Sequence, residues 1–276
     1  IAGFGFPFTI VMPPAGAEVM EVISGDVGER LHALSPVVVI KDVVHIEDKK
    51  HDASSLSPRV RAASRTTLGF VGALIIDSAD SRAWEEERPL ALEALKSGQS
   101  IIMPTDTVYG IACDAFSPDA VNALLAHKGR GRHMPPPVLV ASAEDATKLA
   151  QSVPPEAAAL MSEFWPGGVT IVLEASPDVE WDLGDTQGTV AVRMPNHPVA
   201  LDVLRESGPL AVSSANLTGQ LASVTVSEAY EQFGDALGVY IDAGPVGHAY
   251  ADAPGNPGST IVDATQVASG GPWRVL

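Results

Sequence analysis

The feature that most constrains the fold is the alternation of helix-like and strand-like segments from about residue 76 to the end of the chain. The segment 117–129, for example, opens with Ser117 and Pro118, which favour a helix start, and closes with Gly129, which favours a helix end. The runs between such helices are short, rich in Val and Ile, and often apolar throughout, as in strands covered on both faces. This order predicts a layered α/β domain.

The pattern predicts six helices and seven strands. The expected helices span 85–98, 117–129, 142–151, 154–165, 197–208 and 225–234, and the expected strands span 99–104, 137–141, 169–175, 188–194, 209–214, 239–244 and 259–265.

The N-terminal part of the chain is much less regular. We therefore divide the chain into an unassigned N-terminal segment, 1–75, and one domain, 76–276, and expect a fragment that starts near Ser78 to fold. Within the first part, 36–46 favours a pair of strands, and 1–17 lacks the basic start of a signal peptide. No apolar run has the length of a membrane span, so we expect a cytoplasmic protein.

The few cations of the domain are unevenly distributed. The chain has 17 Lys and Arg against 34 Asp and Glu, a balance that gives no general basic surface for nucleic acid or membranes. Residues 76–276 hold ten of these cations and 26 of the acids, yet Lys128, Arg130 and Arg132 stand within five residues. Such a cluster indicates an anion site, because ammonium and guanidinium groups bind phosphate and carboxylate. A solvated loop that caps the preceding helix is the simpler alternative.

Side chains with hydroxyl groups follow one of the predicted strands closely. The stretch "PTDTVYG" places Thr105, Thr107 and Tyr109 directly after the strand expected at 99–104. These residues are poor turn formers, but their hydroxyls suit a small polar ligand. Since loops at strand ends form the ligand crevice of α/β sheets, this loop is a candidate binding element.

Four more loops carry comparable groups. Arg193 ends an apolar strand, where a buried charge needs either a structural Asp or a ligand carboxylate as its partner. The loop with Lys128, Arg130 and Arg132 is a second such element. The remaining loops carry Thr170, Ser214, Asn216 and Ser259. We expect these loops to converge on one cleft.

Several common catalytic motifs are missing from the sequence. It has no G-x-x-x-x-G-K-[ST], no G-x-G-x-x-G after a strand, no G-x-S-x-G and no H-E-x-x-H. Cys113 is the only cysteine, which excludes an internal disulfide and a cysteine-cluster zinc site.

Six segments, taken in order, resemble the YrdC-like family, the threonylcarbamoyl-AMP synthases of tRNA modification. They are "PTDTVYGIACDA", "KGRGRHMPPPVLV", "FWPGGVTIVL", "VAVRMPNHPVA", "LAVSSANLTG" and "GSTIVDAT". The resemblance runs from about residue 85 to the end and fits the single-domain type. It implies a twisted, largely parallel mixed sheet with flanking helices around a concave cleft. It also implies a nucleotidyltransferase that makes threonylcarbamoyl-adenylate and pyrophosphate from L-threonine, bicarbonate and ATP, for a partner transferase that modifies tRNA.

The resemblance further implies roles for individual residues. Lys128 and Arg130 match a K-x-R pair that would hold bicarbonate and the ATP phosphates, so we expect alanine at either position to lower activity about 10²-fold. Stability should barely change, because both are expected in a polar loop. Thr105 and Tyr109 would hold the threonine substrate, and Arg193 its carboxylate. The side chains expected along the nucleotide are Lys128, Arg130, Thr170, Ser214, Asn216 and Ser259. Mg²⁺ would be bound through the ATP phosphates, without a dedicated protein site.

The chain departs from the family pattern at several positions, and two other functions share the fold. Gly168 stands where a P-G-P turn commonly has proline, Ser213 where proline is common before Ser214, and Gly258 where Glu is common. A double-stranded RNA-binding or ribosome-maturation module is the main alternative, which the acidic balance of 76–276 disfavours. A carbamoyl-transfer domain of hydrogenase maturation is disfavoured by the single cysteine, because that domain accompanies cysteine-rich zinc fingers.

Overall fold

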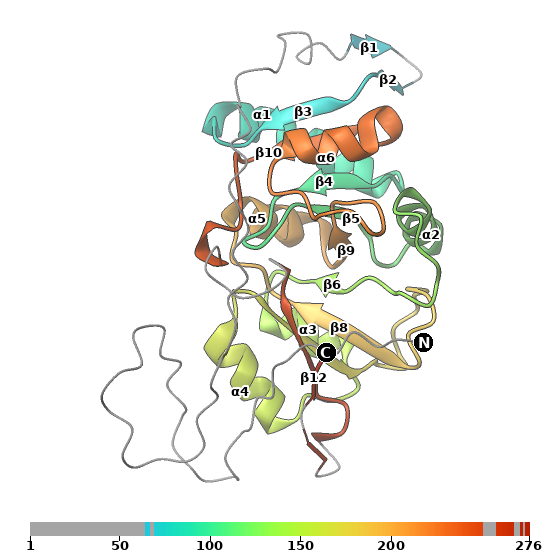
Figure 1. The fold of residues 1–276 in the computed structure, drawn as a ribbon, viewed down its shortest axis with the longest axis vertical. Coiled ribbons are helices and arrows are strands. Elements are labelled where there is room, and N and C mark those ends of the chain that lie inside the picture. Colours follow the sequence, from blue (N-terminus) through green and yellow to red (C-terminus); the bar gives the residue numbers. More distant parts are fainter. Residues whose placement is uncertain (1–63, 67–68, 251–257, 268–270, 273) are drawn as a thin grey trace, which may run out of the picture.

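A ten-stranded sheet organises the fold (Figure 1). The computed structural model describes residues 64–66, 69–250, 258–267, 271–272 and 274–276. The strands of the large sheet are β3 (Leu74–Asp77), β4 (Ile101–Met103), β5 (Gly110–Asp114), β6 (Val138–Leu139), β7 (Val169–Glu174), β8 (Thr189–Arg193), β9 (Leu210–Ser214), β10 (Val239–Asp242), β11 (Thr260–Asp263) and β12 (Arg274–Val275). Their spatial order is β12-β11-β7-β8-β6-β9-β5-β4-β10-β3. A separate antiparallel pair joins β1 (Ser64–Thr66) to β2 (Gly69–Val71).

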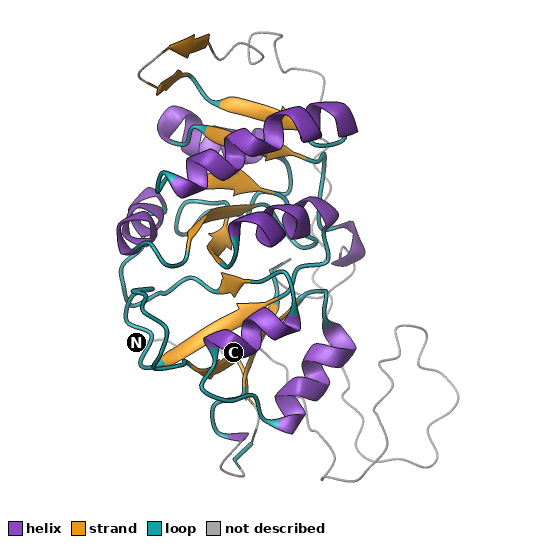
Figure 2. Ribbon diagram, turned by 180° about the vertical axis from the view of Figure 1, so that it is seen from behind, coloured by secondary structure: helices purple, strands orange, loops and turns teal. Residues whose placement is uncertain are grey.

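Helices lie on both faces of the sheet (Figure 2). The described α-helices are α1 (Ser81–Lys96), α2 (Pro118–His127), α3 (Ala143–Leu149), α4 (Pro155–Phe164), α5 (Pro198–Ser207) and α6 (Val226–Phe233). Successive residues of one strand enter different cores, as the pleat requires. Ile101 packs in a cluster under α1 and α5, whereas Ile102 packs in a larger cluster that includes residues of α2, α3, α4 and α6. This coverage explains why a central strand such as β4 is apolar throughout.

The pairing pattern is more antiparallel than we expected. Among the described strands, four pairs of the large sheet are parallel and five are antiparallel. The α/β class with flanking helices is confirmed, but the expectation of a largely parallel sheet was wrong. One reason is β5, which was not predicted and which follows β4 through the short loop 104–109. A connection of this length returns the chain antiparallel, whereas a parallel neighbour needs a crossover.

The ends of the helices are set by capping side chains. Ser117 caps α2 as predicted, its hydroxyl accepting the Ala120 N–H at 3.3 Å. Thr225 and Glu228 form a reciprocal capping box at the start of α6. Helix α1 begins four residues earlier than expected, because the Asp80 carboxylate accepts backbone N–H groups of the first turn.

The sheet begins slightly before the boundary that we placed at residue 76. Strand β3 pairs in parallel with β10, with Leu74 beside Val239, and Ile76 is fully buried. A fragment that starts near Ser78 would therefore lose an edge strand, so a start near Gly72 is the better choice. The strands expected at 36–46 lie outside the described residues, and the division at 75 stays a prediction. None of the described helices has the length and apolarity that crossing a membrane requires.

Candidate functional site

The loop 104–109, between β4 and β5, is closed by its own threonine. The Thr105 hydroxyl accepts the N–H groups of Thr107 and Val108 at 3.2 Å each, and donates to the Val108 carbonyl at 2.5 Å. Thr105 is buried, with 3% of its surface exposed. The hydroxyl that we expected to bind threonine thus also shapes the loop, and its role toward a substrate stays a prediction.

Tyr109 anchors the same loop to the end of β10. Its hydroxyl donates to the Gly244 carbonyl at 2.7 Å and accepts the Ala243 N–H at 3.0 Å. The side chain is fully buried, and this burial raises the pKa of Tyr109. The structure therefore places the hydroxyl against the backbone of residues 243–244.

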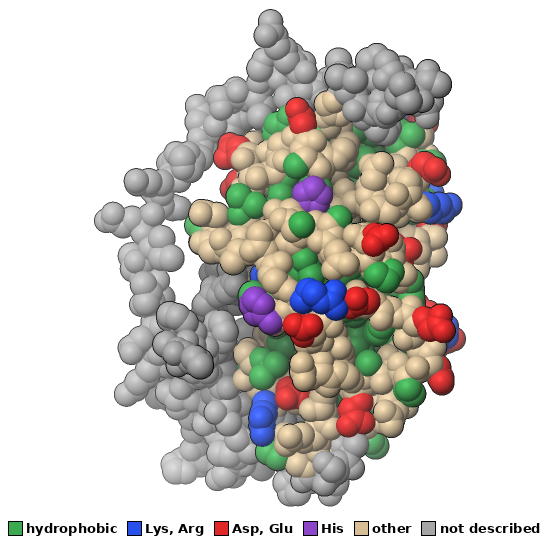
Figure 3. Space-filling model, turned by 90° about the vertical axis from the view of Figure 1, so that its right-hand side faces the viewer, with side chains coloured by type: hydrophobic (Ala, Val, Ile, Leu, Met, Phe, Trp, Pro, Cys, Tyr) green, Lys and Arg blue, Asp and Glu red, His purple; other side chains and the backbone are tan. Residues whose placement is uncertain are grey.

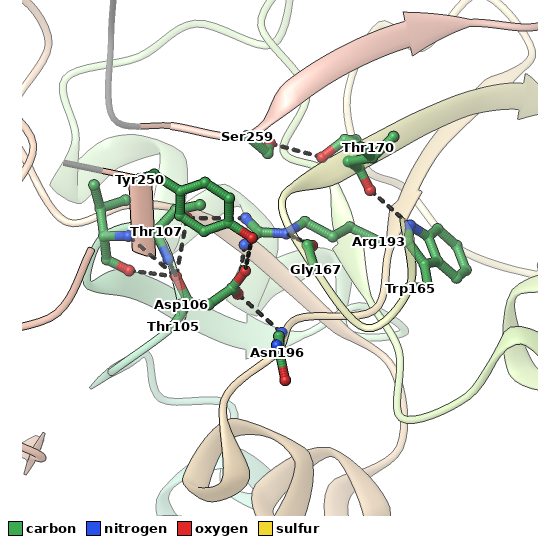
Figure 4. A network of polar contacts seen from close by, with 12 residues as sticks. Thr105, Asp106, Thr107, Trp165, Gly167, Thr170, Arg193, Asn196, Tyr250 and Ser259 are labelled. Atoms are coloured by element: carbon green, nitrogen blue, oxygen red, sulfur yellow. Dashed lines mark hydrogen bonds and ion pairs between the residues drawn. The ribbon is translucent and has the colours of Figure 1, made fainter. Parts of the chain in front are cut away.

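Arg193, at the end of β8, lies in a buried ion pair (Figure 4). Its Nη2 donates to Asp106 Oδ1 at 2.6 Å, its Nη1 to the Thr107 hydroxyl at 3.1 Å, and its Nε to the Gly167 carbonyl at 2.8 Å. Burial lowers the pKa of Arg193, and the charge of Asp106 opposes that shift. Of the two partners that the sequence left open, the structure shows the Asp.

Asp106 receives two further hydrogen bonds that sequence reasoning missed. The Asn196 N–H donates to Oδ1 at 3.0 Å, and the Tyr250 hydroxyl donates to Oδ2 at 3.0 Å. Figure 4 shows the carboxylate between these groups and the Arg193 guanidinium. Both carboxylate oxygens are thus engaged, so the network ties the 104–109 loop to the segments after β8 and β10.

Lys128 ends α2 and is buried, with 1% of its surface exposed. Its Nζ donates to the carbonyls of Ser214 and Asn216, the latter at 2.7 Å, and lies 3.5 Å from Asn216 Oδ1. Burial and the neighbouring Arg130 charge lower the pKa of Lys128 to about 7. The expectation that Lys128 lies in a polar loop was therefore wrong. The expectation that its removal leaves stability unchanged loses its basis and stays a prediction to be tested.

Of the three clustered cations, Arg130 makes the fewest hydrogen bonds. Its Nη1 donates to the Ser213 hydroxyl at 3.2 Å, while its buried Nε has no partner within the described part of the chain. Burial lowers the pKa of Arg130. Among the described residues, no carboxylate forms a salt bridge with Arg130 or Lys128. Two neighbouring positive groups without an acid favour an anionic ligand.

Arg132 does not share this environment. It is exposed, and its guanidinium pairs with Asp182 at 2.6 Å and with Asp185 at 3.7 Å. It also donates to Asn122 Oδ1 at 3.2 Å. The three cations of the predicted cluster therefore divide into two without an acid partner in the described part of the chain and one that holds the segment 182–185.

The loop after β9 surrounds the Lys128 amine. The Ser214 hydroxyl donates to Asn216 Oδ1, and Asn216 Nδ2 donates to the carbonyls of Leu217 and Gln220 at 2.9 Å each. The Tyr109 carbonyl accepts the Ala215 N–H at 2.7 Å, which joins this loop to the 104–109 loop. The structure thus links the loops that carry Lys128, Ser214 and Asn216 to the loop that carries Thr105.

Thr170 and Ser259 form a further contact near the ion pair. Their hydroxyls lie 2.7 Å apart, bridging β7 to the residue before β11. Thr170 is fully buried, and Figure 4 shows the pair beyond the Arg193 side chain, on the side away from Asn196. The predicted residues therefore form two linked groups, one around Asp106 and Arg193 and one around Lys128 and Arg130.

Fold and site together define a class of protein. It is a mixed α/β domain in which two cations, without a carboxylate partner among the described residues, lie beside hydroxyl groups. The Sua5/YciO/YrdC family model, described as "Telomere recombination", matches residues 93–276. The chain belongs to this family.

Named relatives agree with this assignment. A Mycobacterium tuberculosis protein, named provisionally as a threonylcarbamoyl-AMP synthase, is 51% identical over 63% of this chain and 77% of its own length. The threonylcarbamoyl-AMP synthase of Mus musculus is 35% identical over 67% of this chain and 65% of its own length. The sequence therefore lies close to proteins that carry the synthase name.

A solved structure supports the fold directly. P. abyssi Sua5 in complex with L-threonine has a TM-score of 0.65 and 30% identity, over 74% of this chain and 57% of that one. This chain thus spans little more than half the length of that protein. E. coli YciO, at 20% identity and a TM-score of 0.58, shares the fold.

Proposed function

We propose that this protein is a threonylcarbamoyl-AMP synthase, an enzyme that makes threonylcarbamoyl-adenylate and pyrophosphate from L-threonine, bicarbonate and ATP. The observation that carries the proposal is the pair of cations, Lys128 and Arg130, which have no acid partner among the described residues of a chain with net charge -17. The relatives named threonylcarbamoyl-AMP synthases support the reaction, and the neighbour bound to L-threonine supports the substrate.

The proposed chemistry needs charge neutralisation more than proton transfer. The threonine amine adds to bicarbonate with loss of water, and an oxygen of the resulting carbamate attacks the α-phosphorus of ATP. The bond to pyrophosphate breaks as the new P–O bond forms. Positioned cations stabilise the charge on the phosphoryl oxygens. Arg130, whose Nε has no partner among the described residues, is the group best placed to bind phosphate. Lys128 adds positive charge beside it when its amine is protonated.

The threonine side of the site is assigned to the 104–109 loop. The polar groups of Thr105, Tyr109 and Arg193 are bound within the protein, so in this proposal they fix the shape of the pocket as well as its polarity. A site held rigid by such bonds loses less entropy when it binds its substrate.

The nucleotide side is assigned to Thr170, Ser214, Asn216 and Ser259, together with the two cations. Mg²⁺ would arrive on the ATP phosphates. Within the described residues, no group of three or more His, Cys, Asp or Glu side chains is arranged to hold a metal ion. In this proposal phosphate and water supply most of the ligands of Mg²⁺, as they commonly do in nucleotide enzymes.

Binding of double-stranded RNA is the weaker candidate function. Such recognition relies largely on phosphate and sugar contacts, which require basic surface. On the face shown in Figure 3, acidic side chains are spread widely and basic ones are few. We therefore propose that tRNA is reached through a partner transferase that accepts the adenylate.

The test is a reaction with ATP, Mg²⁺, labelled bicarbonate and L-threonine, in which pyrophosphate and a labelled adenylate are measured. We expect both products only when all substrates are present. Pyrophosphate release that does not depend on threonine, or label that never enters an adenylate, would overturn the proposal. Omission of each substrate in turn provides the control.

A further inference from the structure

Tyr250 bridges the two sides of the proposed site. Its hydroxyl donates to Asp106 Oδ2 at 3.0 Å, on the loop assigned to threonine. The same phenol packs against Gly168, in the turn that leads into β7 and Thr170, where a Cβ would come within 3.1 Å of the tyrosine oxygen. Figure 4 shows the tyrosine ring beside the Asp106–Arg193 pair, with Thr170 and Ser259 beyond the arginine. One phenol thus connects segments that are far apart in the sequence.

The position of Tyr250 depends on Gly168, which stands where the family commonly has proline. A Cβ on Gly168 would lie 3.0–3.1 Å from the Tyr250 ring and hydroxyl, closer than side chains normally approach. The chain's departure from the P-G-P turn therefore makes room for the tyrosine.

The segment before Tyr250 also lies against the 104–109 loop. The Tyr109 hydroxyl bonds to the Gly244 carbonyl, and a Cβ on Gly247 would meet the Thr107 carbonyl at 2.5 Å. Gly247 has a φ of 84°, a conformation that favours glycine. Residues 244–250 therefore follow the loop closely and end in the bond from Tyr250 to Asp106.

We propose that Tyr250 is a positioning residue, which acts through Asp106 and Arg193 to hold the 104–109 loop and the 165–170 turn in register for substrate binding. The inference rests on the proposed function for its effect on turnover. Asp106 accepts hydrogen bonds from Arg193, Asn196 and Tyr250. Arg193 also reaches the 165–170 turn, through the Gly167 carbonyl. Tyr250 packs on Gly168 of that turn and bonds Asp106 through an uncharged hydroxyl. Removing that hydroxyl should loosen the register without removing a charge.

The test compares Tyr250→Phe and Gly168→Ala with a matched control, Tyr230→Phe. Tyr230 likewise bonds an aspartate, Asp235, at 3.0 Å, but it lies on α6 outside the site. We expect Tyr250→Phe to raise KM for threonine and for ATP about tenfold, the equivalent of one hydrogen bond to a charged group, with kcat changed less than about threefold. Gly168→Ala should act similarly, and the double variant should be no worse than either single one.

A second readout does not require turnover. Hydrogen exchange of peptides covering 104–109 and 194–197 reports the bonds of the Val108 and Asn196 amides. We expect faster exchange in Tyr250→Phe and unchanged exchange in Tyr230→Phe. If the wild type makes no adenylate, the proposed function fails, and the exchange experiment alone decides the role of Tyr250. Exchange at the wild-type rate, a lowered kcat at unchanged KM, or additive losses in the double variant would overturn the inference.

Discussion

Two regions of the described chain hold buried or half-buried cations, and the two regions differ in how those cations are paired. Arg193 is paired with Asp106 at 2.6 Å and bonds two further oxygens. Lys128 and Arg130 lie near the end of α2, and neither has an acid partner among the described residues. Both environments are desolvated, since burial is the largest cause of the lowered pKa in each of the three side chains.

The difference in pairing distinguishes a cation that stabilises the fold from cations that are available to bind a ligand. A buried cation that is fully matched by protein groups contributes to the fold, whereas one left without a counter-charge lowers the free energy of the complex only when an anion arrives. The chain has 34 acidic residues, so the lack of an acid beside Lys128 and Arg130 is not explained by scarcity. We therefore expect substitutions in the two regions to have different consequences, for stability in one and for activity in the other.

The largest effect is expected at the ion pair. Arg193→Met should destabilise the protein by about 3–5 kcal/mol, because it leaves the Asp106 carboxylate buried and unpaired. The matched control is Arg205→Met, which removes an exposed pair with Asp202 at 2.8 Å and should cost less than about 1 kcal/mol. Urea unfolding of both variants measures the difference, and equal losses would show that the buried pair has no special structural role.

The next effect concerns catalysis. Arg130→Ala should lower kcat/KM about 10²-fold, because a charge is lost where the phosphate is proposed to bind. Arg132→Ala, only two residues away and paired with Asp182, should stay within about threefold of the wild type. Steady-state pyrophosphate release tests both variants. If Arg132→Ala is as impaired as Arg130→Ala, the general charge of the loop matters and the pairing does not.

Lys128 combines the two cases, because its amine bonds protein carbonyls and also lies in the proposed anion site. Lys128→Met should lower activity and also cost about 1–3 kcal/mol of stability, since the carbonyls of Ser214 and Asn216 lose their charged donor. Thermal unfolding beside Arg130→Ala is the measurement. If Lys128→Met is as stable as the wild type, the bonds of the Lys128 amine do not contribute to stability, as expected from the sequence.

The same lysine predicts a pH dependence. Its folded pKa is lowered to about 7 by burial and by Arg130, while an unfolded lysine titrates near ~10.4. Between these values the unfolded chain binds a proton that the folded protein does not, so stability from this group rises with pH. We expect the stability of wild type, relative to Lys128→Met, to increase from about pH 7 to pH 10 and to be constant below pH 7. Parallel unfolding curves for the two proteins across this range would contradict the shift.

The smallest effect concerns the threonine pocket. Serine lacks one methyl group of threonine, worth roughly 1 kcal/mol, so it should be about five- to tenfold less efficient as a substrate. Valine lacks the hydroxyl and should be worse still. Thr105→Val should raise KM for threonine and leave KM for ATP nearly unchanged. A valine that outperforms serine would mean that the pocket selects shape, and that the Thr105 hydroxyl serves the loop alone.

The sequence predicted features that depend on neighbouring residues, and it missed features that depend on residues far apart in the chain. Helix ends marked by local residues, such as Ser117, were predicted closely. The strand β5 was missed because "GIACD" directly follows a stretch interpreted as a ligand loop. The burial of Lys128 depends on carbonyls 86 and 88 residues away, and the bond of Tyr250 to Asp106 spans 144 residues. Such contacts leave no local pattern, because any exposed Lys or Tyr would look the same in sequence.

The most direct test of the account is the binding of ATP with Mg²⁺, measured by titration calorimetry on wild type, Arg130→Ala and Arg132→Ala. The account predicts that Arg130→Ala weakens binding by about 30-fold, or ~2 kcal/mol, as expected for a charge-assisted bond to phosphate. Arg132→Ala should bind ATP as the wild type does, because its charge is already matched by Asp182 and Asp185. Wild-type affinity in Arg130→Ala, or an equal loss in both variants, would contradict the claim that the unmatched cations form the anion site.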